Sequence, residues 1–452
     1  MRFRTTLILA LVLALGILGV VYTDKQERNQ EEADRESEKI LAYSGEQVLG
    51  IHLLPAGIRA ERDSSGWQLL APVHTAGDKI SLDAIASLFS WAKKERIVSD
   101  DANDHASFGL IPPRAILILT SASGLDTLFI GDDSQVGSFV YARKGNSPEV
   151  FLTTTSLWSN INKTLFDLRD KNILGFEQGR TDRLEIKNEN GLFTMSKEGD
   201  SWLLHSPKAL RADARKVADL LNALQYQKAL RFVEEEPHDL SAYGFGRPAI
   251  EIRVGSPASV GLRTLSIGSF DAGCYYARDA ARLPVFTVDS SFVHRFNVAL
   301  NDLRDKGMLR FNSEMVSAVE ITAGDTTYIC HRDTAGSWQM LQPKTGPVRS
   351  WKMTGLISDL SSATAEGFAA DEPASLRPFG LDQPRIRCRL LQKKDVIAEF
   401  LIGKNKDAST LYAMAGGGRT VYLIRSDLFD KLNTRSADLL ESLPAASAAS
   451  PE

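Results

Sequence analysis

Cysteine and histidine are scarce in this chain of 452 residues, and neither is arranged as a metal site requires. The seven histidines stand singly, with no His-x-x-x-His or Cys-x-x-Cys pair, so we expect no metal site and no cofactor. The three cysteines, Cys274, Cys330 and Cys388, are too few and too scattered for a disulfide framework. Each lies in a strand-like run and is interpreted as a small buried hydrophobe. A disulfide between Cys330 and Cys388 is the alternative, permitted in an oxidising compartment.

An excess of positive charge is also missing, because 53 lysines and arginines stand against 57 aspartates and glutamates. The formal net charge of -4 offers no basic field, which argues against nucleic-acid binding. Gly416-Gly417-Gly418 lacks the following Lys-Ser/Thr of a phosphate-binding loop and is typical of a hairpin turn. His331-Arg332-Asp333 has none of the companion motifs of a kinase and is read as a turn. No nucleophile stands beside a base, so we expect that the protein is not an enzyme.

Long apolar runs are absent except at the amino terminus, where one extends from Leu7 to Tyr22. With Thr5 and Thr6 it reaches about 18 residues, the lower end of what spans a bilayer as a helix. It ends without a small-x-small cleavage site, so residues 1–23 are predicted to be a retained transmembrane anchor and not a cleaved signal peptide. Arg2 and Arg4 precede the run, and the positive-inside bias keeps that end cytoplasmic. The rest of the chain then faces the periplasm of a bacterial cell, held to the inner membrane by a single pass. Residues 24–40 are almost wholly charged or amide and predict a solvated helical stalk.

The remainder of the chain is a repeat with a period of about 135 residues, because Leu168-Arg169-Asp170-Lys171 recurs at residues 303–306. Trp67, Trp202 and Trp338 follow the same spacing. We therefore assign three modules, 41–172, 173–307 and 308–443, followed by a disordered tail, 444–452.

Each module begins with short alternating strands that end in a Trp-to-Pro segment, followed by a helix. In the middle module this helix carries apolar residues at i, i+3, i+4 and i+7, namely Val217, Leu220, Leu221 and Leu224. After it come an acidic loop, interpreted as solvated and not as a calcium site, an aromatic-Gly turn, a four-strand meander and one closing helix. The predicted fold class is α+β, with three tandem modules that each contain a mainly antiparallel β-sheet and two packed helices, on one amino-terminal transmembrane helix.

Two sets of arginines are candidate functional residues. Arg169-Asp170 and Arg304-Asp305 close the first two modules and are absent from the third, so we interpret them as ties between one module and the next. Arg143 and Arg278 each follow Tyr-Ala on a strand and are candidates for contact with an anionic glycan or a partner. The alternative for this second pair is a strand-edge charge that discourages aggregation.

The order of these motifs resembles the bacterial family called domain of unknown function 4340. The resemblance rests on Trp-x-x-x-x-Pro, aromatic-Gly-apolar-x-x-Pro, apolar-Ile-Gly, Tyr-Ala-Arg and Leu-Arg-Asp-Lys, and it covers residues 41 to 443. The third module departs from it with Met414 in place of Arg143 and Arg278. The family implies membrane-anchored proteins, often encoded beside ABC-type transporters of the kind associated with gliding motility, and it supplies no catalytic residues.

From the resemblance we expect a non-enzymatic, membrane-anchored periplasmic accessory subunit of an envelope ABC-type transport system. Its partners would be a transporter permease or associated envelope proteins, and the lipid bilayer through the anchor. The alternative is a periplasmic scaffold or adhesin-like module that binds cell-wall glycan or another envelope protein.

Overall fold

The computed structural model describes residue 25 and residues 38–41, 44–145, 147–256 and 261–441. The predicted anchor, from Leu7 to Tyr22, most of the charged segment 24–40 and the tail 444–452 lie outside these residues. Within the described part of the chain, no helix combines the length and the apolar character that crossing a bilayer requires. The chain divides into two compact units, one formed by Met1–Gly175, Leu224–Pro248 and Thr264–Val293, the other by Phe176–Ala223, Ala249–Arg263 and His294–Glu452.

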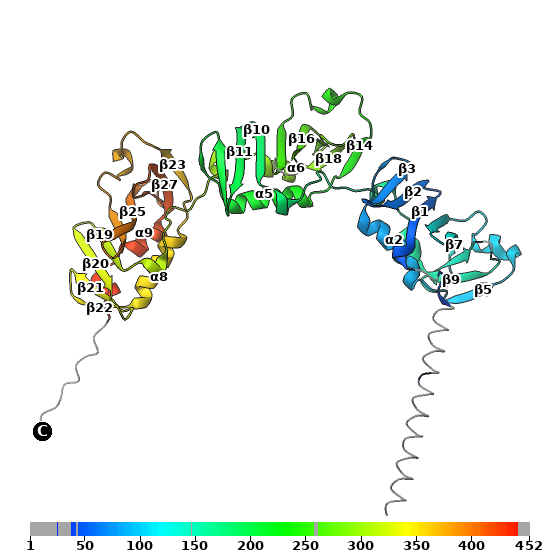
Figure 1. Ribbon diagram of the computed structural model, residues 1–452, viewed down its shortest axis with the longest axis horizontal. Coiled ribbons are helices and arrows are strands. Elements are labelled where there is room, and N and C mark those ends of the chain that lie inside the picture. The colour runs from blue at the N-terminus through cyan, green and yellow to red at the C-terminus, as the bar shows by residue number, and fades with distance from the viewer. Residues whose placement is uncertain (1–24, 26–37, 42–43, 146, 257–260, 442–452) are drawn as a thin grey trace, which may run out of the picture. The chain divides into compact units, whose positions relative to one another are not determined.

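Three nine-stranded antiparallel sheets, one for each repeat, make up the described chain (Figure 1). The predicted class of tandem modules with antiparallel sheets and helices is therefore confirmed. The first sheet has the order β4-β3-β2-β1-β6-β7-β8-β9-β5. Its strands are β1 (Val48–Leu54), β2 (Ile58–Asp63), β3 (Gly66–Ala71), β4 (Thr75–Ala76), β5 (Arg96–Ser99), β6 (Ala115–Ser121), β7 (Gly124–Asp133), β8 (Phe139–Lys144) and β9 (Val150–Thr154).

The second and third sheets repeat this order strand for strand. The second contains β10 (Arg183–Asn188), β11 (Gly191–Glu198), β12 (Ser201–Ser206), β13 (Leu210–Arg211), β14 (Arg231–Glu234), β15 (Ile250–Ser256), β16 (Gly261–Asp271), β17 (Cys274–Asp279) and β18 (Val285–Asp289). The third contains β19 (Ala318–Ala323), β20 (Thr326–Arg332), β21 (Trp338–Gln342), β22 (Gly346–Val348), β23 (Gly367–Asp371), β24 (Ile386–Gln392), β25 (Asp395–Asn405), β26 (Thr410–Ala415) and β27 (Thr420–Arg425).

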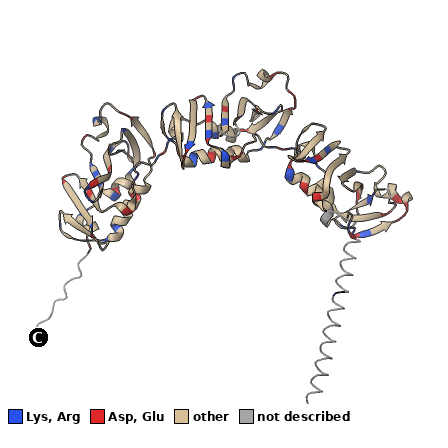
Figure 2. Cartoon of the chain, viewed as in Figure 1, with Lys and Arg blue, Asp and Glu red and all other residues tan. Residues whose placement is uncertain are grey.

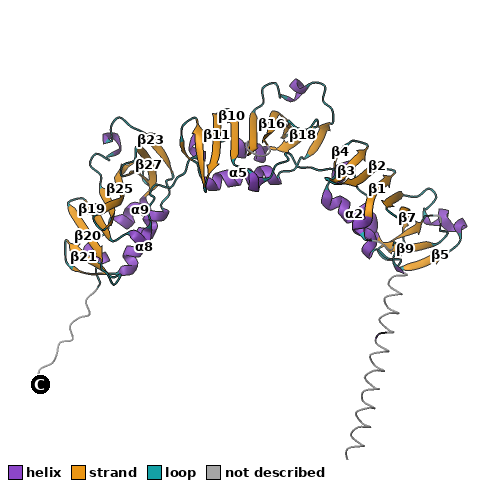
Figure 3. Cartoon of the chain, in the orientation of Figure 1, coloured by secondary structure: helices purple, strands orange, loops and turns teal. Residues whose placement is uncertain are grey.

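One long helix in each repeat packs on its sheet through the predicted apolar stripe (Figure 3). These helices are α2 (Lys79–Trp91), α5 (Ala214–Tyr226) and α8 (Ser350–Ser362). In α5, Val217, Leu220, Leu221 and Leu224 are all buried, as the spacing predicts. Asp78 begins α2 by accepting a hydrogen bond from the backbone N–H of Ser81 at 2.8 Å, the usual way to satisfy a free helix-end donor.

The prediction of one closing helix per module is wrong, because each is two short helices. They are α3 (Thr155–Ile161) and α4 (Leu165–Leu168), α6 (Ser290–Phe296) and α7 (Leu300–Leu303), and α9 (Ser426–Leu432) and α10 (Ser436–Leu439). The break comes from an aspartate in the first turn of each second helix. Asp167, Asp302 and Asp438 accept the backbone N–H three residues earlier, at 2.8, 2.8 and 3.2 Å. That hydrogen bond starts a new helix and lets the chain change direction.

The edge strands β4 and β5, with their equivalents in the other sheets, were not anticipated. β5 lies where an acidic loop was predicted, and it pairs with β9 at the edge of the sheet, with Ile97 opposite Phe151. A strand of two to four residues is too short to show the alternation by which strands are predicted.

A short 3₁₀ helix precedes the repeated aromatic-Gly turn in each module: η2 (Ala102–Phe108), η4 (Leu240–Tyr243) and η6 (Arg377–Phe379). The turn crosses the sheet so closely that a Cβ on Gly131 would lie 2.1 Å from the carbonyl oxygen of Phe108. Gly109 itself has a φ of 68°, a conformation that favours glycine. The Ile-Gly motif on the strand and the aromatic-Gly motif in the turn therefore contact each other. The remaining 3₁₀ turns are η1 (Gly45–Gln47), η3 (Gln178–Arg180) and η5 (Ser313–Met315).

All three cysteines are free, so the alternative of a Cys330–Cys388 disulfide is wrong. Cys330 on β20 and Cys388 on β24 lie on the two sides of β19, paired with Val319 and Ile321 of that strand. Two strand spacings separate their backbones by about 10 Å, beyond the reach of a disulfide. Burial raises the pKa of Cys330 to about 11 and that of Cys388 to about 12, which fits the interpretation as small core residues.

Candidate functional site

The segment that contains Leu168 and Arg169 returns from the closing helices to the β4 edge of its own sheet. The backbone N–H of Asp78 donates to the carbonyl of Leu168 at 2.7 Å, and the N–H of Asp170 donates to Ala76 at 2.8 Å. Arg169 itself forms a bridge with Gly77. The end of the first module is therefore fixed to that module's first half.

The next residues of the same segment pair with the second module. Asn172 forms a bridge with Lys228, and the N–H of Ala229 donates to the carbonyl of Lys171 at 2.8 Å. Lys228 and Ala229 lead directly into β14, the edge strand of the second sheet. Four consecutive residues thus pair with the edge of one module and then with the edge of the next, all within the first compact unit.

The side chain of Arg169 crosses to the second module. Its guanidinium lies 3.3 Å from the ring centroid of Phe232, and its two terminal nitrogens donate to the carboxylate of Glu235, the Nη2–Oε2 distance being 3.0 Å. Only 2% of Arg169 is exposed. Stacking on an aromatic ring and bidentate pairing with a carboxylate are the two contacts for which a guanidinium is best shaped. We call this arrangement of arginine, aromatic ring and carboxylate an arginine junction.

The second arginine junction repeats the first within the other compact unit. Arg304 lies 3.7 Å from the ring centroid of Phe368 and donates to the two carboxylate oxygens of Asp371 at 2.8 and 3.0 Å. It is 5% exposed, and Thr420 adds a hydrogen bond to Asp371 at 3.1 Å. Burial by itself raises the pKa of Asp371, but the hydrogen bonds and charge of Arg304 outweigh it and hold this pKa below its usual value.

Asp170 and Asp305, the aspartates of the predicted ties, do not contact Glu235 or Asp371, the carboxylates that the arginines bind. Asp170 accepts the N–H of Asn172 at 2.9 Å, and Asp305 accepts the N–H of Gly307 at 2.9 Å while pairing with Arg310. They shape the turn that carries the chain onward, and the arginines make the long-range contact.

The third module keeps the backbone of this arrangement and loses the arginine. Leu440 forms a bridge with Val348, and the N–H of Arg349 donates to Leu439 at 2.9 Å, as at the other module ends. Leu440 stands where Arg169 and Arg304 stand in the earlier modules. The first module in turn has Ile97 and Asp100 at the positions of Phe232 and Glu235, and Ile97 is 54% exposed.

Sequence reasoning missed the receiving residues, because it placed Glu235 and Asp371 in solvated acidic loops and did not single out Phe232 or Phe368. Phe232 and Glu235, like Phe368 and Asp371, share the spacing Phe-x-x-acid directly after the long helix. The two modules that receive an arginine have this spacing, whereas the first module, which receives none, has Ile97 in place of the phenylalanine. This difference is the sequence signal that links the Phe-x-x-acid residues to the arginines.

Arg143 and Arg278 occupy equivalent places on β8 and β17 but have different surroundings. The guanidinium of Arg143 lies 3.7 Å from the ring centroid of Phe129, and its Nη1 donates to the carbonyl of Gly145. Burial lowers the pKa of Arg143. The residue opposite Arg278 is Ser266, which offers no ring. Among the described residues, the buried Nε atoms of both Arg143 and Arg278 have no hydrogen-bond partner.

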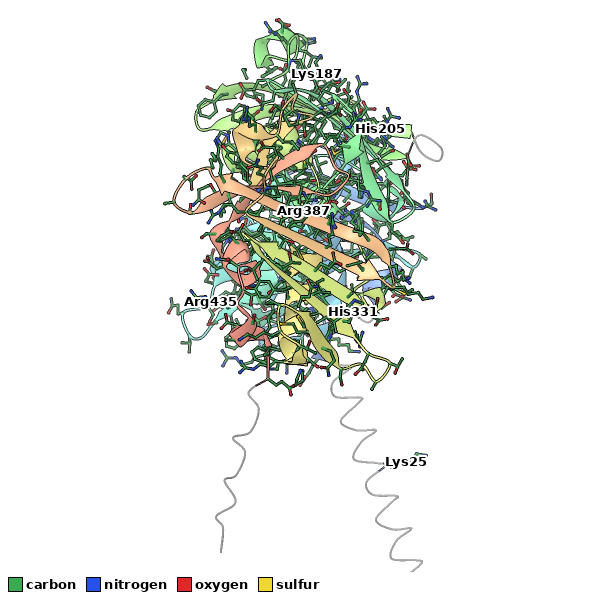
Figure 4. All side chains as sticks on the ribbon, turned by 90° about the vertical axis from the view of Figure 1, so that its left-hand side faces the viewer. Lys25, Lys187, His205, His331, Arg387 and Arg435 are labelled. Atoms are coloured by element: carbon green, nitrogen blue, oxygen red, sulfur yellow. The ribbon has the colours of Figure 1, made fainter. Side chains whose placement is uncertain are left out.

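A serine and a histidine that the sequence did not bring together also meet. Ser196 Oγ lies 2.6 Å from Nε2 of His205, and His205 is exposed on β12 (Figure 4). The pair lies on neighbouring strands of the open sheet face, like the ion pair of Arg387 with Glu399 on the third sheet. In the described chain no group of three or more metal-binding side chains comes together. Acidic and basic residues are interspersed over strands and helices (Figure 2).

Comparison with known proteins connects the chain to one family. A family model with the description "Domain of unknown function (DUF4340)" matches residues 67–205, 202–377 and 338–445. Each match begins at the tryptophan of a Trp-x-x-x-x-Pro segment, Trp67, Trp202 or Trp338. No curated protein matches the chain. A solved structure, the DNA polymerase III subunit beta from Pseudomonas aeruginosa, aligns at 8% identity over 68% of this chain and 82% of that chain, with a TM-score of 0.13, which does not indicate a shared fold.

Proposed function

Because the chain belongs to the DUF4340 family, with three copies of the domain in tandem, we propose that it is a membrane-anchored, non-enzymatic accessory subunit of an envelope ABC-type transport system. It would stand in the periplasm on a single amino-terminal helix, with its amino terminus in the cytoplasm. Its modules would contact the transporter permease or an associated envelope protein.

The observation that carries this proposal is the pair of arginine junctions. Arg169 and Arg304 are almost fully buried and each binds a carboxylate of the following module through two nitrogens. Burying a guanidinium costs free energy that only such pairing offsets. A chain that uses its two most buried arginines to join modules is suited to holding binding surfaces in series.

The periplasmic location is supported by the sequence at the amino terminus. Arg2 and Arg4 precede the apolar run from Leu7 to Tyr22, and this charge bias favours retention of the first residues in the cytoplasm. A reporter enzyme that is active only after export, fused after Glu452, should be active. Activity of a reporter that works only in the cytoplasm would contradict this orientation.

Copurification of the full chain from membranes in a mild detergent tests the transporter association. We expect permease subunits to accompany the protein and to be lost when both arginine junctions are opened by Arg169→Leu and Arg304→Leu. The matched control is Arg143→Met, which changes an arginine of the first module outside either junction. Recovery of the chain without any transporter subunit, under conditions that preserve known transporter complexes, would refute the association.

A second candidate function is a periplasmic scaffold that binds cell-wall glycan or another envelope protein. One observation favours it, the position of Arg278 opposite Ser266, which offers no ring on which the guanidinium could stack. Binding of glycan by the full chain without transporter subunits would separate this candidate from the first.

A further inference from the structure

One sheet surface differs sharply among the three modules. It is the face of β8, β17 or β26 that lies under the aromatic-Gly turn, opposite the face that packs on the helices. In the third module Ala413 belongs to the main core, whereas its neighbour Met414 belongs to a separate small cluster on the other face. We call this the turn-side face.

In the third module the turn-side face carries a cluster of buried apolar side chains. Met414, Leu401, Leu381 and Val421 are buried together, and Phe379 packs at 5.1 Å on Tyr412. Met414 stands here where the other two modules have an arginine.

In the first module the same face is partly polar, and its arginine is stacked on an aromatic ring. Phe108 packs at 4.7 Å on Tyr141, and Arg143 stacks on Phe129 and donates to Gly145. The ring of Phe129 takes the place that Leu401 has in the third module, since each pairs with the residue after Tyr-Ala.

In the middle module the equivalent positions are polar. Tyr243 replaces Phe108 and donates to Glu234 at 2.5 Å, and Tyr276 donates to Asp271 at 2.7 Å. The two rings meet edge to face at 5.0 Å. Ser266 replaces the ring of Phe129, so the guanidinium of the half-buried Arg278 lacks the stack that Arg143 has.

We propose that the turn-side face of the middle module is a saccharide-binding site in which Arg278 binds a carboxylate of an acidic sugar. The proposal rests on the second candidate function, glycan binding, and identifies the module, the residues and the class of sugar. The sugar ring would lie against Tyr243 and Tyr276, and its hydroxyl groups would donate hydrogen bonds to Glu234 and Asp271.

The chemistry of these side chains fits such a ligand. A guanidinium that lacks an internal acceptor binds a carboxylate best, through two parallel hydrogen bonds. Tyrosine offers an apolar face to the C–H groups of a sugar ring and keeps a polar tip for its hydroxyls. Glu234 and Asp271 are each already bound to a tyrosine hydroxyl, which reduces their repulsion of an anionic ligand.

The test uses the full chain in detergent micelles and two monosaccharide probes, N-acetylmuramic acid and N-acetylglucosamine, which differ by a lactyl carboxylate. Ligand-detected magnetic resonance should show binding of the first probe and about tenfold weaker binding of the second, the effect of one lost charge-assisted pair. Equal binding of both probes would overturn the role of Arg278. Binding of neither probe would overturn the site.

Substitutions that should preserve the fold can be taken from the third module of the same chain. Arg278→Met and Tyr243→Phe install residues that the third module carries at the same positions, so both variants should remain folded. We expect each to weaken binding of N-acetylmuramic acid, Arg278→Met by about tenfold and Tyr243→Phe by less, because the phenyl ring remains. Arg143→Met is the matched control and should leave binding unchanged.

Two outcomes would assign these residues another role. If Arg278→Met raises the melting temperature and leaves binding unchanged, the arginine is only a strained structural residue. If Arg278→Met abolishes contact with a periplasmic protein and the sugar never binds, the face is a protein interface. Neither outcome bears on copurification with transporter subunits, so failure of this site is distinguishable from failure of the transporter proposal.

Discussion

The two arginine junctions use one design with different surroundings. At the first, Arg169 pairs with a glutamate, and Phe166 lies 6.3 Å from the ring of Phe232 on which the arginine stacks. At the second, Arg304 pairs with the shorter Asp371 and also donates to Asn301, the counterpart of Phe166, at 3.3 Å. The constant elements are a buried arginine, an aromatic ring and a carboxylate.

The comparison shows which residues an arginine junction requires and at which position the residue can differ. The ring and the carboxylate compensate for burial of the two terminal nitrogens, which would otherwise cost several kcal/mol. The neighbour at position 166 or 301 lies at the edge and is replaceable by a residue of different character. We therefore expect the loss of an arginine to matter most and the loss of an edge residue to matter little.

The largest effect should follow from Arg304→Leu, which gives the second module the residue that ends the third. The change removes the stack on Phe368 and both hydrogen bonds to Asp371, and leaves that carboxylate without its cation. We expect the coupling between modules two and three to fall by about 2–3 kcal/mol. Calorimetry of the full chain should resolve an additional unfolding transition, as nearest-neighbour coupling in repeat proteins predicts.

Arg169→Leu is the parallel change at the first junction and should uncouple modules one and two in the same way. Arg143→Met serves as the control for loss of a half-buried arginine that joins no modules. An unfolding profile of Arg304→Leu that coincides with that of the wild type would show that the contact contributes nothing to coupling.

A smaller effect is expected from acidification at the second junction. The pKa of Asp371 is depressed in the folded state, so its contribution to stability is fully present above its unfolded value of about 3.9. That contribution is lost as the pH falls through the lower folded value. The coupling of modules two and three should therefore be constant near neutrality and decline below about pH 4.

Comparison of the wild type with the Asp371→Asn variant reports on this one carboxylate, because the other acidic groups titrate in both proteins. The variant should have weaker coupling at pH 7, by about 1–2 kcal/mol, because a charge-assisted pair becomes a neutral one. The stability difference between wild type and variant should shrink as the pH drops below 4. A difference that stays constant over this range would exclude Asp371 as the titrating group.

The repeated sheets could be predicted from sequence because their signals are repeated three times. Periodicity located the long helices, and the turn glycines located the crossing over the sheet. The closing helix was mispredicted because Leu157, Ile161, Leu165 and Leu168 keep helical spacing across a break. That break is stabilised by three hydrogen bonds between Thr164 and Asp167, which periodicity does not register.

The arginine junctions were predicted only on their donor side. The recurrence of Arg169 and Arg304 marked them, but their partners lie 66 and 67 residues further along the chain. Hydrophobic periodicity reports on residues close in sequence and does not identify partners that are so far apart. The Ile-Gly motif already aligns Ser266 with Phe129 in the sequence, but only the strand pairing of the structure places these residues opposite Arg278 and Arg143.

A still smaller effect is expected from exchanging the edge residues of the two junctions. Phe166→Asn should weaken the first junction by about 1 kcal/mol, since Phe166 is 36% exposed and contributes mainly one aromatic contact. Asn301→Phe should change the second by less, because only a 3.3 Å hydrogen bond is lost. Calorimetric coupling in both variants is the measurement, and a loss as large as that of Arg304→Leu would contradict the edge assignment.

The smallest effect should come from Leu440→Arg, which restores at the end of the third module the residue of the first two. The segment around Leu440 already has the backbone arrangement of a junction, bridged to Val348. No ring and carboxylate of a following module stand beside it in the described chain, so the new guanidinium has nothing to bind and will turn to water. Leu440 is only partly buried against the third core, so the lost packing should cost less than about 1 kcal/mol. Calorimetry should show the transitions of the wild type with the last one slightly lowered. If Leu440→Arg instead produced a concentration-dependent dimer, measured by sedimentation, the new arginine would have found an acceptor on a second copy, which would contradict this expectation.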